Sequence, residues 1–233
     1  MVTPQRRVRL ERLGALIAVL LGAFALGLWH PGERGAFWQG IEGRLLDARF
    51  RLRGPLPPPQ QVAIIAFDDA AIATMATFPP SRTALGTVVA AAWKSGAQVL
   101  ALDFLLIDAR KDDPLLASAL AQGSAIVGVA EAASGASAPA MHNRGGLALV
   151  TGPAPLAPLP VLGPTVALQE VAGLGHVTVA HGPDGVLRRM RPELAMTTAQ
   201  GVAHYPALAV AAVAARAGAA RYLANPNGIG GRL

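Results

Sequence analysis

Residues 62–69 read VAIIAFDD and residues 99–107 read VLALDFLLI, and these two stretches decide the fold. Each is an apolar run of the kind expected for a strand that is buried on both faces. One amphipathic helical pattern lies between the runs, so together they predict a βαβ unit. The carboxyl ends of its parallel strands should meet at one edge of the sheet, where open α/β sheets bind their ligands. The carboxylates that this arrangement places together are Asp68, Asp69 and Asp103.

Further helices and strands are expected on both sides of this edge. Apolar periodicity, caps and turn residues predict helices over residues 85–93, 115–122, 166–172 and 206–216, and strands over residues 62–67, 98–106, 125–129 and 147–150. The turn at residues 182–185 (GPDG) should join residues 176–180 and 186–191 into an antiparallel hairpin. We therefore expect an α/β fold, a three-layer sandwich with a mostly parallel central sheet and an antiparallel edge hairpin, preceded by an N-terminal transmembrane helix.

The N-terminal part of the chain has the pattern of a membrane anchor. Residues 13–29 form a charge-free apolar run, and residues 1–12 form a basic flank that contains Arg6, Arg7, Arg9 and Arg12. By the positive-inside rule, the arginines should hold the flank in the cytoplasm and place the rest of the chain outside the membrane. A cleaved signal peptide is the competing interpretation of the same run. We expect a single-pass protein of the cell membrane whose bulk is extracytoplasmic.

Residues 30–59 should connect this anchor to the globular part. An apolar stripe predicts a juxtamembrane helix over residues 33–53, and the proline-rich residues 54–59 end it. Residues 60–224 then form the extracytoplasmic domain, and residues 225–233 form a tail. One alternative function is a structural module of the cell envelope that dimerises through this helix. The apolar stripe would also allow the chain to form a homodimer. The stripe consists of Phe37, Ile41, Leu45, Ala48 and Leu52.

Charge and composition exclude several classes of function. The chain carries a formal net charge of +6 and a pI near 10.9, but residues 1–53 hold nine Arg against four acidic residues, so the basicity belongs to the flank. The remaining residues give no basic patch of the kind that binds nucleic acid, and we expect no nucleic-acid partner. The chain contains no Cys, which removes thiol catalysis, Cys-ligated zinc and disulfides. Hydrolase, phosphate-loop and dinucleotide motifs are also absent from the sequence.

The polar residues near the predicted sheet edge allow more than one chemistry. Two carboxylates at one edge could bind a divalent cation, so an exported metal-dependent hydrolase built on Asp69 and Asp103 is an alternative. Arg82 could pair with Asp69 or clamp an anionic ligand. The simpler interpretation is that these residues cap turns and form ion pairs, and our leading interpretation is a protein that is not an enzyme and needs no metal or cofactor.

Seven short segments, taken in order, carry a resemblance to a known family. The segments are residues 47–55 (DARFRLRGP), 62–69 (VAIIAFDD), 79–82 (PPSR), 96–104 (GAQVLALDF), 112–116 (DDPLL), 175–177 (GHV) and 184–189 (DGVLRR). In this order they resemble the second type of the CHASE domain, the sensory extracellular domain associated with cyclases and histidine kinases, and the resemblance covers about residues 40–215.

The resemblance implies a sensory domain outside the membrane that recognises a small ligand or an envelope signal. Members of the family typically feed a cytoplasmic nucleotide cyclase or protein kinase, which would lie outside the present residues. Two positions depart from the family pattern, because Ala70–Ala71 and Phe78 stand where members often carry a small hydroxyl residue and a tryptophan. The positions that match the recurring polar residues of the family, and that we take as candidate ligand-binding residues, are Asp68, Asp69, Arg82, Asp103, Asp184 and Arg188.

Overall fold

The structure is a computed structural model that describes part of the chain in detail. The described residues are 14–23, 36–75, 77–132, 140–141, 148–150, 159–182, 184–218, 221–224 and 231–232. They fall into two compact units. Unit 1 comprises residues 1–62 and 181–188, and unit 2 comprises residues 63–180 and 189–233.

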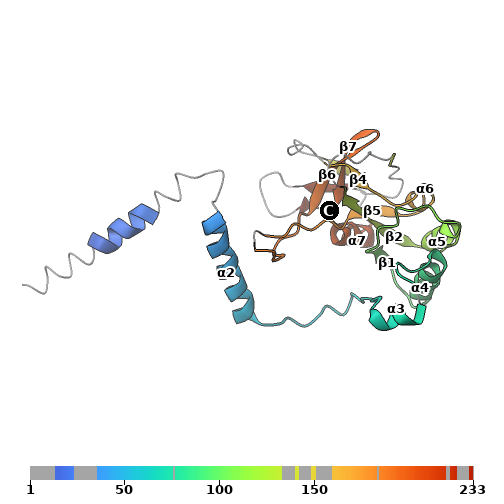
Figure 1. Cartoon of the computed structure of the whole chain (residues 1–233), viewed down its shortest axis with the longest axis horizontal. Helices are drawn as coiled ribbons and strands as arrows, with labels where there is room; N and C mark the ends of the chain where they lie inside the picture. The colour runs from blue at the N-terminus through green and yellow to red at the C-terminus, as the bar shows by residue number, and fades with distance from the viewer. Residues whose placement is uncertain are drawn as a thin grey trace, which may run out of the picture. The chain divides into compact units, whose positions relative to one another are not determined.

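The centre of unit 2 is a mostly parallel sheet (Figure 1). Strand β2 (Ser124–Glu131) lies between β1 (Val99–Leu102) and β5 (Gly173–His176) and is parallel to both. The short strand β4 (Val161–Leu162) pairs antiparallel with the end of β2. Strand β1 is shorter than the expected residues 98–106, and β2 is longer than the expected residues 125–129, but the parallel arrangement of these two strands is confirmed.

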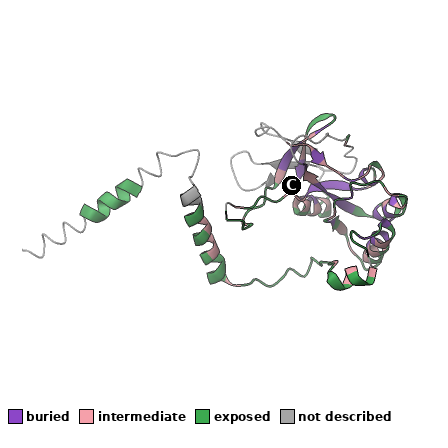
Figure 2. Ribbon diagram, in the orientation of Figure 1, coloured by how far each residue is buried: buried purple, intermediate pink, exposed green. Residues whose placement is uncertain are grey.

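Helices contribute to the core clusters on both faces of this sheet, and Figure 2 shows that the strands and helices of this unit contain most of the buried residues. Side chains alternate between the two faces of a strand, so neighbouring residues of β2 report on opposite layers. Val127 belongs to the larger core cluster, with α4 (Arg82–Lys94) and α5 (Asp113–Leu120), whereas Ile126 packs against α7 (Leu208–Arg216) on the other side. The indole Nε1 of Trp93 donates a hydrogen bond of 2.9 Å to the carbonyl of Ala119, which links α4 to α5.

The remaining elements of unit 2 surround this sandwich. Helix α3 (Asp69–Met75) precedes α4, and the single-turn helix α6 (Val166–Gln169) precedes β5. Strands β6 (Glu193–Thr198) and β7 (Gly201–Pro206) form an antiparallel hairpin. A small separate sheet contains β3 (Ala148–Val150), β8 (Arg221–Ala224) and β9 (Gly231–Arg232).

The predicted hairpin is wrong in its position. The turn itself exists, because Gly185 has a φ of +76° and donates a backbone hydrogen bond of 2.9 Å to Gly182. The arms on either side of it, residues 177–180 and 186–191, form no strands. The antiparallel hairpin lies further along the chain, in β6 and β7, because strands form where a register of backbone partners exists and not wherever a turn is favourable.

The predicted first strand is also wrong. Residues 62–68 have no assigned strand structure, and residues 62–66 are exposed. The physical reason is the lack of a ladder: β1 is paired with β2, and no other described strand pairs with β1. An extended apolar run is a strand only when a neighbour accepts and donates its backbone hydrogen bonds.

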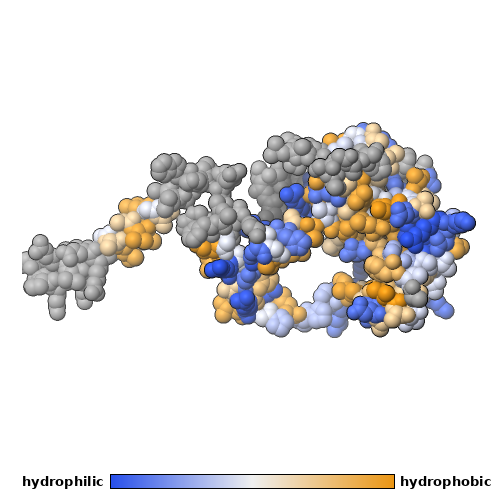
Figure 3. Space-filling view, viewed as in Figure 1, coloured by the Kyte–Doolittle hydropathy of each residue, from blue (hydrophilic) through white to orange (hydrophobic). Residues whose placement is uncertain are grey.

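Unit 1 contains two described helices and a loop. Helix α2 (Ala36–Arg53) matches the predicted juxtamembrane helix and ends at Gly54, whose φ is +70°. Residues 14–23 of the predicted anchor are helical and exposed, and Figure 3 shows their hydrophobic side chains; residue 13 and residues 24–29 lie outside the described residues. Within the described part of the chain, no helix has both the length and the hydropathy required to cross a bilayer.

Candidate functional site

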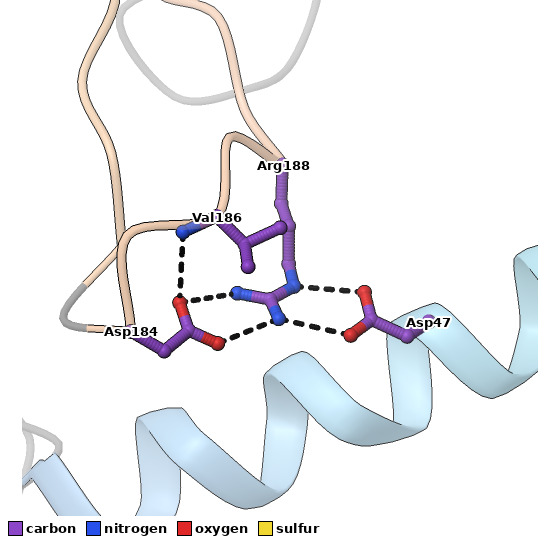
Figure 4. A network of polar contacts seen from close by, with 4 residues as sticks. All are labelled: Asp47, Asp184, Val186 and Arg188. Atoms are coloured by element: carbon purple, nitrogen blue, oxygen red, sulfur yellow. Dashed lines mark hydrogen bonds and ion pairs between the residues drawn. The ribbon is translucent and has the colours of Figure 1, made fainter.

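In the described part of unit 1, the guanidinium of Arg188 contacts two carboxylates at once (Figure 4). Its Nε and Nη2 atoms donate to the two carboxylate oxygens of Asp47 at 2.8 and 2.9 Å. Its Nη1 and Nη2 atoms donate to the two oxygens of Asp184 at 2.8 and 2.7 Å. Two bidentate contacts on one guanidinium use the fork geometry that makes arginine–carboxylate pairs strong. The result is a clamp, which we call the Arg188 clamp, between α2 and the loop of residues 181–188.

Small residues on both elements make room for the clamp. A Cβ atom at Gly43 of α2 would lie 3.2 Å from Cζ of Arg188, and a Cβ atom at Gly182 would lie 3.0 Å from a carboxylate oxygen of Asp184. The backbone amide of Val186 donates to Asp184 at 3.2 Å, so the turn fixes the position of that carboxylate. Glycine at position 43 therefore lets Arg188 approach the helix closely, and glycine at position 182 leaves room for the carboxylate of Asp184 within the loop.

The clamp changes the protonation of its members. The hydrogen bonds from Arg188, followed by the amide of Val186, lower the pKa of Asp184 to about 2. The same guanidinium lowers the pKa of Asp47, and the two carboxylates together raise the pKa of Arg188. The side chain of Arg188 is 15 % exposed and that of Asp184 is 51 % exposed, so the pair is partly accessible to water and to ions.

A second polar cluster lies in unit 2, at the beginning of α4. Arg82 is 2 % exposed and donates from Nε to Asp113 at 2.8 Å and from Nη2 to the carbonyl of Asp108 at 3.0 Å. Burial alone would raise the pKa of Asp113, but the hydrogen bonds from Arg82 and from the amide of Arg110 outweigh it and hold the pKa below its ordinary value. The expected pairing of Arg82 with Asp69 is wrong, because Asp113 takes this place.

The neighbouring Asp112 explains why the loop before α5 is ordered. It occupies the N-cap position of α5, and Asp113 is the first residue of that helix. Its carboxylate accepts hydrogen bonds from the backbone amide and the hydroxyl of Thr83 at 3.0 and 3.2 Å. The hydrogen bond from the amide lowers the pKa of Asp112. The two carboxylates of residues 112 and 113 therefore both bind the start of α4, which rigidifies the contact between the two helices.

The strand-end carboxylates lie near the carboxyl end of β1. Asp68 caps α3, since its side chain accepts a hydrogen bond of 2.9 Å from the amide of Ala71. Asp69 is the first residue of α3, and Asp103 follows β1; both are exposed. The rings of Phe67 and Phe104, which adjoin these acids, are 5.4 Å apart in an edge-to-face arrangement. The contact brings the two chain segments together, as the βαβ pattern predicted.

The six candidate residues thus fall into three groups. Asp184 and Arg188 meet in unit 1, Arg82 is buried in an ion pair, and Asp68, Asp69 and Asp103 lie on the two segments joined by the phenylalanine contact. Sequence reasoning missed the partners Asp47 and Asp113. Asp47 begins one of the family segments and Asp113 is part of another, which was the available signal, but their contacts span 141 and 31 positions.

The family model of the CHASE2 domain matches residues 15–229, which is nearly the whole chain. No curated protein and no solved structure matches it significantly.

Proposed function

The chain belongs to the CHASE2 domain family, which consists of sensory extracellular domains, and from this membership we propose that it is the signal-input domain of a membrane-bound receptor. The match over residues 15–229 is the observation that carries the proposal. The family is sensory and not catalytic, which supports a role in recognition without catalysis. The output, a nucleotide cyclase or a protein kinase, would lie outside these 233 residues.

Helix α2 is the element that we propose as the transmitter. It follows the apolar run of residues 13–29, which we propose as a single-pass anchor that leaves the bulk of the chain extracytoplasmic. The Arg188 clamp binds α2 to the loop of residues 181–188, and this loop connects β5 to β6 along the chain. A change in the position of β5 or β6 would therefore reach α2 through a short covalent path and the bidentate contact between Arg188 and Asp47.

The ligand would bind at the carboxyl end of β1, next to Asp68, Asp69 and Asp103. Open α/β sheets use this edge for binding, and the exposed Asp69 and Asp103 are accessible there. Arg82 is a positioning residue in this proposal, because its donors already serve Asp113 and the carbonyl of Asp108. Asp184 and Arg188 would belong to the transmitting contact and not to the ligand site itself.

Two measurements test the proposal. Alkaline phosphatase joined after residue 224 should be active in cells, because the enzyme matures only outside the cytoplasm; an inactive but intact fusion would contradict the location. A screen of small metabolites against the folded protein should find a compound that raises its melting temperature, and Asp103→Ala should abolish the shift. A shift that survives Asp103→Ala would place the ligand elsewhere.

The metal-dependent hydrolase has no support from a specific observation. Among the residues that the structure describes, no three His, Cys, Asp or Glu side chains gather into a metal-binding group. The alternative predicts that calcium, magnesium or manganese raises the melting temperature and that a chelator reverses the rise. This measurement separates the hydrolase from the sensor, which needs no metal.

The exposed side of α2 favours a homodimer. Ile41, Leu45, Ala48 and Leu52 follow the alternating spacing of four and three residues that is typical of a coiled-coil seam. All four are exposed, while the clamp binds the helix through Gly43 and Asp47, which lie off this seam. Leu45→Cys should therefore form a disulfide-linked dimer on oxidation, whereas Arg49→Cys, off the seam, should not. Equal dimer yields from both variants would argue against pairing through the seam.

A further inference from the structure

One edge of β1 is open. Val99, Leu100, Ala101 and Leu102 pair with residues 124–127 of β2 on one side, and among the described strands none pairs with β1 on the other. An open edge presents a row of backbone donors and acceptors to which another extended segment can add. The open edge of β1 is therefore a surface that fits a strand.

The same unit contains an extended segment without a strand partner. Residues 63–66 read AIIA, and Ile64 and Ile65 are 89 % and 58 % exposed. Figure 2 shows the chain between α2 and α3 in the colour of exposed residues. β-branched side chains favour strands, and large apolar side chains in water favour burial. The segment therefore has the apolar composition of a core strand but is exposed to solvent like a linker.

The contact between Phe67 and Phe104 sets the direction in which the segment could add to β1. Phe67 follows the segment and Phe104 follows β1, and their rings are 5.4 Å apart. A strand that runs into Phe67 would therefore be parallel to β1, with Ile64 beside Ala101 and Ile65 beside Leu102. The helices α3 and α4 between the two segments provide the crossover that parallel strands require.

The side chains fit this register on both faces of the sheet. Ile65 would share the face of Leu102 and Phe67, which belong to or pack on the larger core cluster with α4 and α5. Ile64 would share the face of Val99, which packs on the cluster with α7. A strand of a three-layer sandwich must be apolar on both faces, and this segment is.

We propose that the open edge of β1 is the docking site of residues 63–66 of the same chain, which add to it as a parallel strand and form the input-dependent element of the domain. The occupant is the chain's own segment and not that of a second copy, because the phenylalanine contact within the chain already holds one end beside β1. Docking would move the start of the linker that leads to α2. The regulatory part of this proposal rests on the proposed sensory function, whereas the docking itself does not.

A disulfide test is direct because the chain contains no cysteine. The full chain carrying Ile64→Cys and Ala101→Cys should form an intrachain disulfide on mild oxidation, since neighbouring strands place Cα atoms within the distance that a disulfide requires. The control is Ile64→Cys with Thr87→Cys, a pair that joins the same segment to the exposed Thr87 of α4 and should stay reduced. Covalent dimers from the first pair would show that a second copy occupies the edge, and persistent free thiols would show that the edge stays open; either result overturns the proposal.

Hydrogen exchange tests the docking without any substitution. Amides of residues 63–66 should exchange at least about tenfold more slowly than those of an unstructured peptide, because a paired strand protects its backbone. Exchange at the unstructured rate would overturn the proposal. Both readouts concern the position of the segment alone, so their failure leaves the phosphatase and ligand tests of the sensory function unaffected.

Discussion

The substitution Arg82→Met tests whether the cluster at the start of α4 is structural. The side chain is 2 % exposed, and removing its guanidinium leaves the carboxylate of Asp113 buried without its main partner and the carbonyl of Asp108 without a donor. Breaking a buried ion pair from one side typically costs about 3–5 kcal/mol. Since whole domains are stable by about 5–15 kcal/mol, this single change should remove a large share of the free energy of unfolding.

The effect should be visible in thermal and urea unfolding at neutral pH. A domain of this size loses about 2–4 °C of melting temperature per kcal/mol, so the variant should melt about 6–20 °C lower. The matched control is Lys94→Met, at the other end of α4, where the side chain is exposed and the loss should be small. The double variant Arg82→Met with Asp113→Leu should regain much of the stability, because replacing both members of a buried pair by apolar residues is often neutral.

The stability of the native protein and that of the Arg82→Met variant should depend differently on pH. In the native protein the pKa of Asp113 is below its ordinary value of 3.8, so the pair stabilises the fold above about pH 4 and this stabilisation is lost as the pH falls through the folded pKa. Without Arg82, burial should raise the pKa of Asp113, and the deficit of Arg82→Met should therefore shrink in acid. A deficit below about 1 kcal/mol at neutral pH would refute a desolvated pair, since that is the range of exposed ion pairs.

Three further predictions concern other parts of the fold. Stabilisation by Asp184, whose pKa is about 2, should be lost as the pH falls from about 4 toward 2 and should loosen the turn of residues 181–188, whereas Arg188→Lys, which loses the bidentate contact with Asp47, should release this loop from α2 already at neutral pH; proteolysis of the loop measures both. Gly175→Ala should lower the melting temperature, because its Cβ would lie 2.7 Å from the Cα of Leu208 in the backbone of α7; a melting temperature unchanged from the native value would contradict this contact. Burial lowers the pKa of His176 from 6.5, so the native stability should decline as the pH falls below 6.5, and His176→Gln, which has no proton to gain, should show a smaller decline in urea unfolding.

The sequence predicted the elements whose signal is local. The helices α4, α5 and α7 carry an apolar period and end signals, and β1 and β2 are apolar runs, so their order and the three layers followed. Strand β5 was displaced in the prediction because its sequence, GLGH, has two glycines. Gly175 is required there by the close approach of Leu208 in α7, which is a tertiary cause that strand propensity does not register.

In the candidate site, too, contacts between residues close in sequence were easier to predict than contacts between distant ones. The family segments placed Asp184 and Arg188 four positions apart, and their contact was within reach of sequence reasoning. The contact between Arg188 and Asp47 was not within reach of sequence reasoning. Asp47 lies 141 positions away, on a helix with other charged residues that could equally have formed an ion pair with the loop. Likewise Asp113 had an acceptable local role at the start of α5, and only the packing of α4 on α5 gives Arg82 a buried partner there.

The first predicted strand differs from these cases, because a strong local signal has no tertiary counterpart in the structure. An apolar, β-branched run predicts burial on both faces, and that preference belongs to the side chains whatever the backbone is bonded to. Strand geometry needs in addition a neighbouring edge, and one that fits in direction and on both faces lies open at β1. Since residues 63–66 are exposed and no described strand pairs with the second edge of β1, the proposed docking would join two elements that are both available for it. An element of this kind can take up or give up its place with little change elsewhere, which is what the proposed transmission through α2 would require.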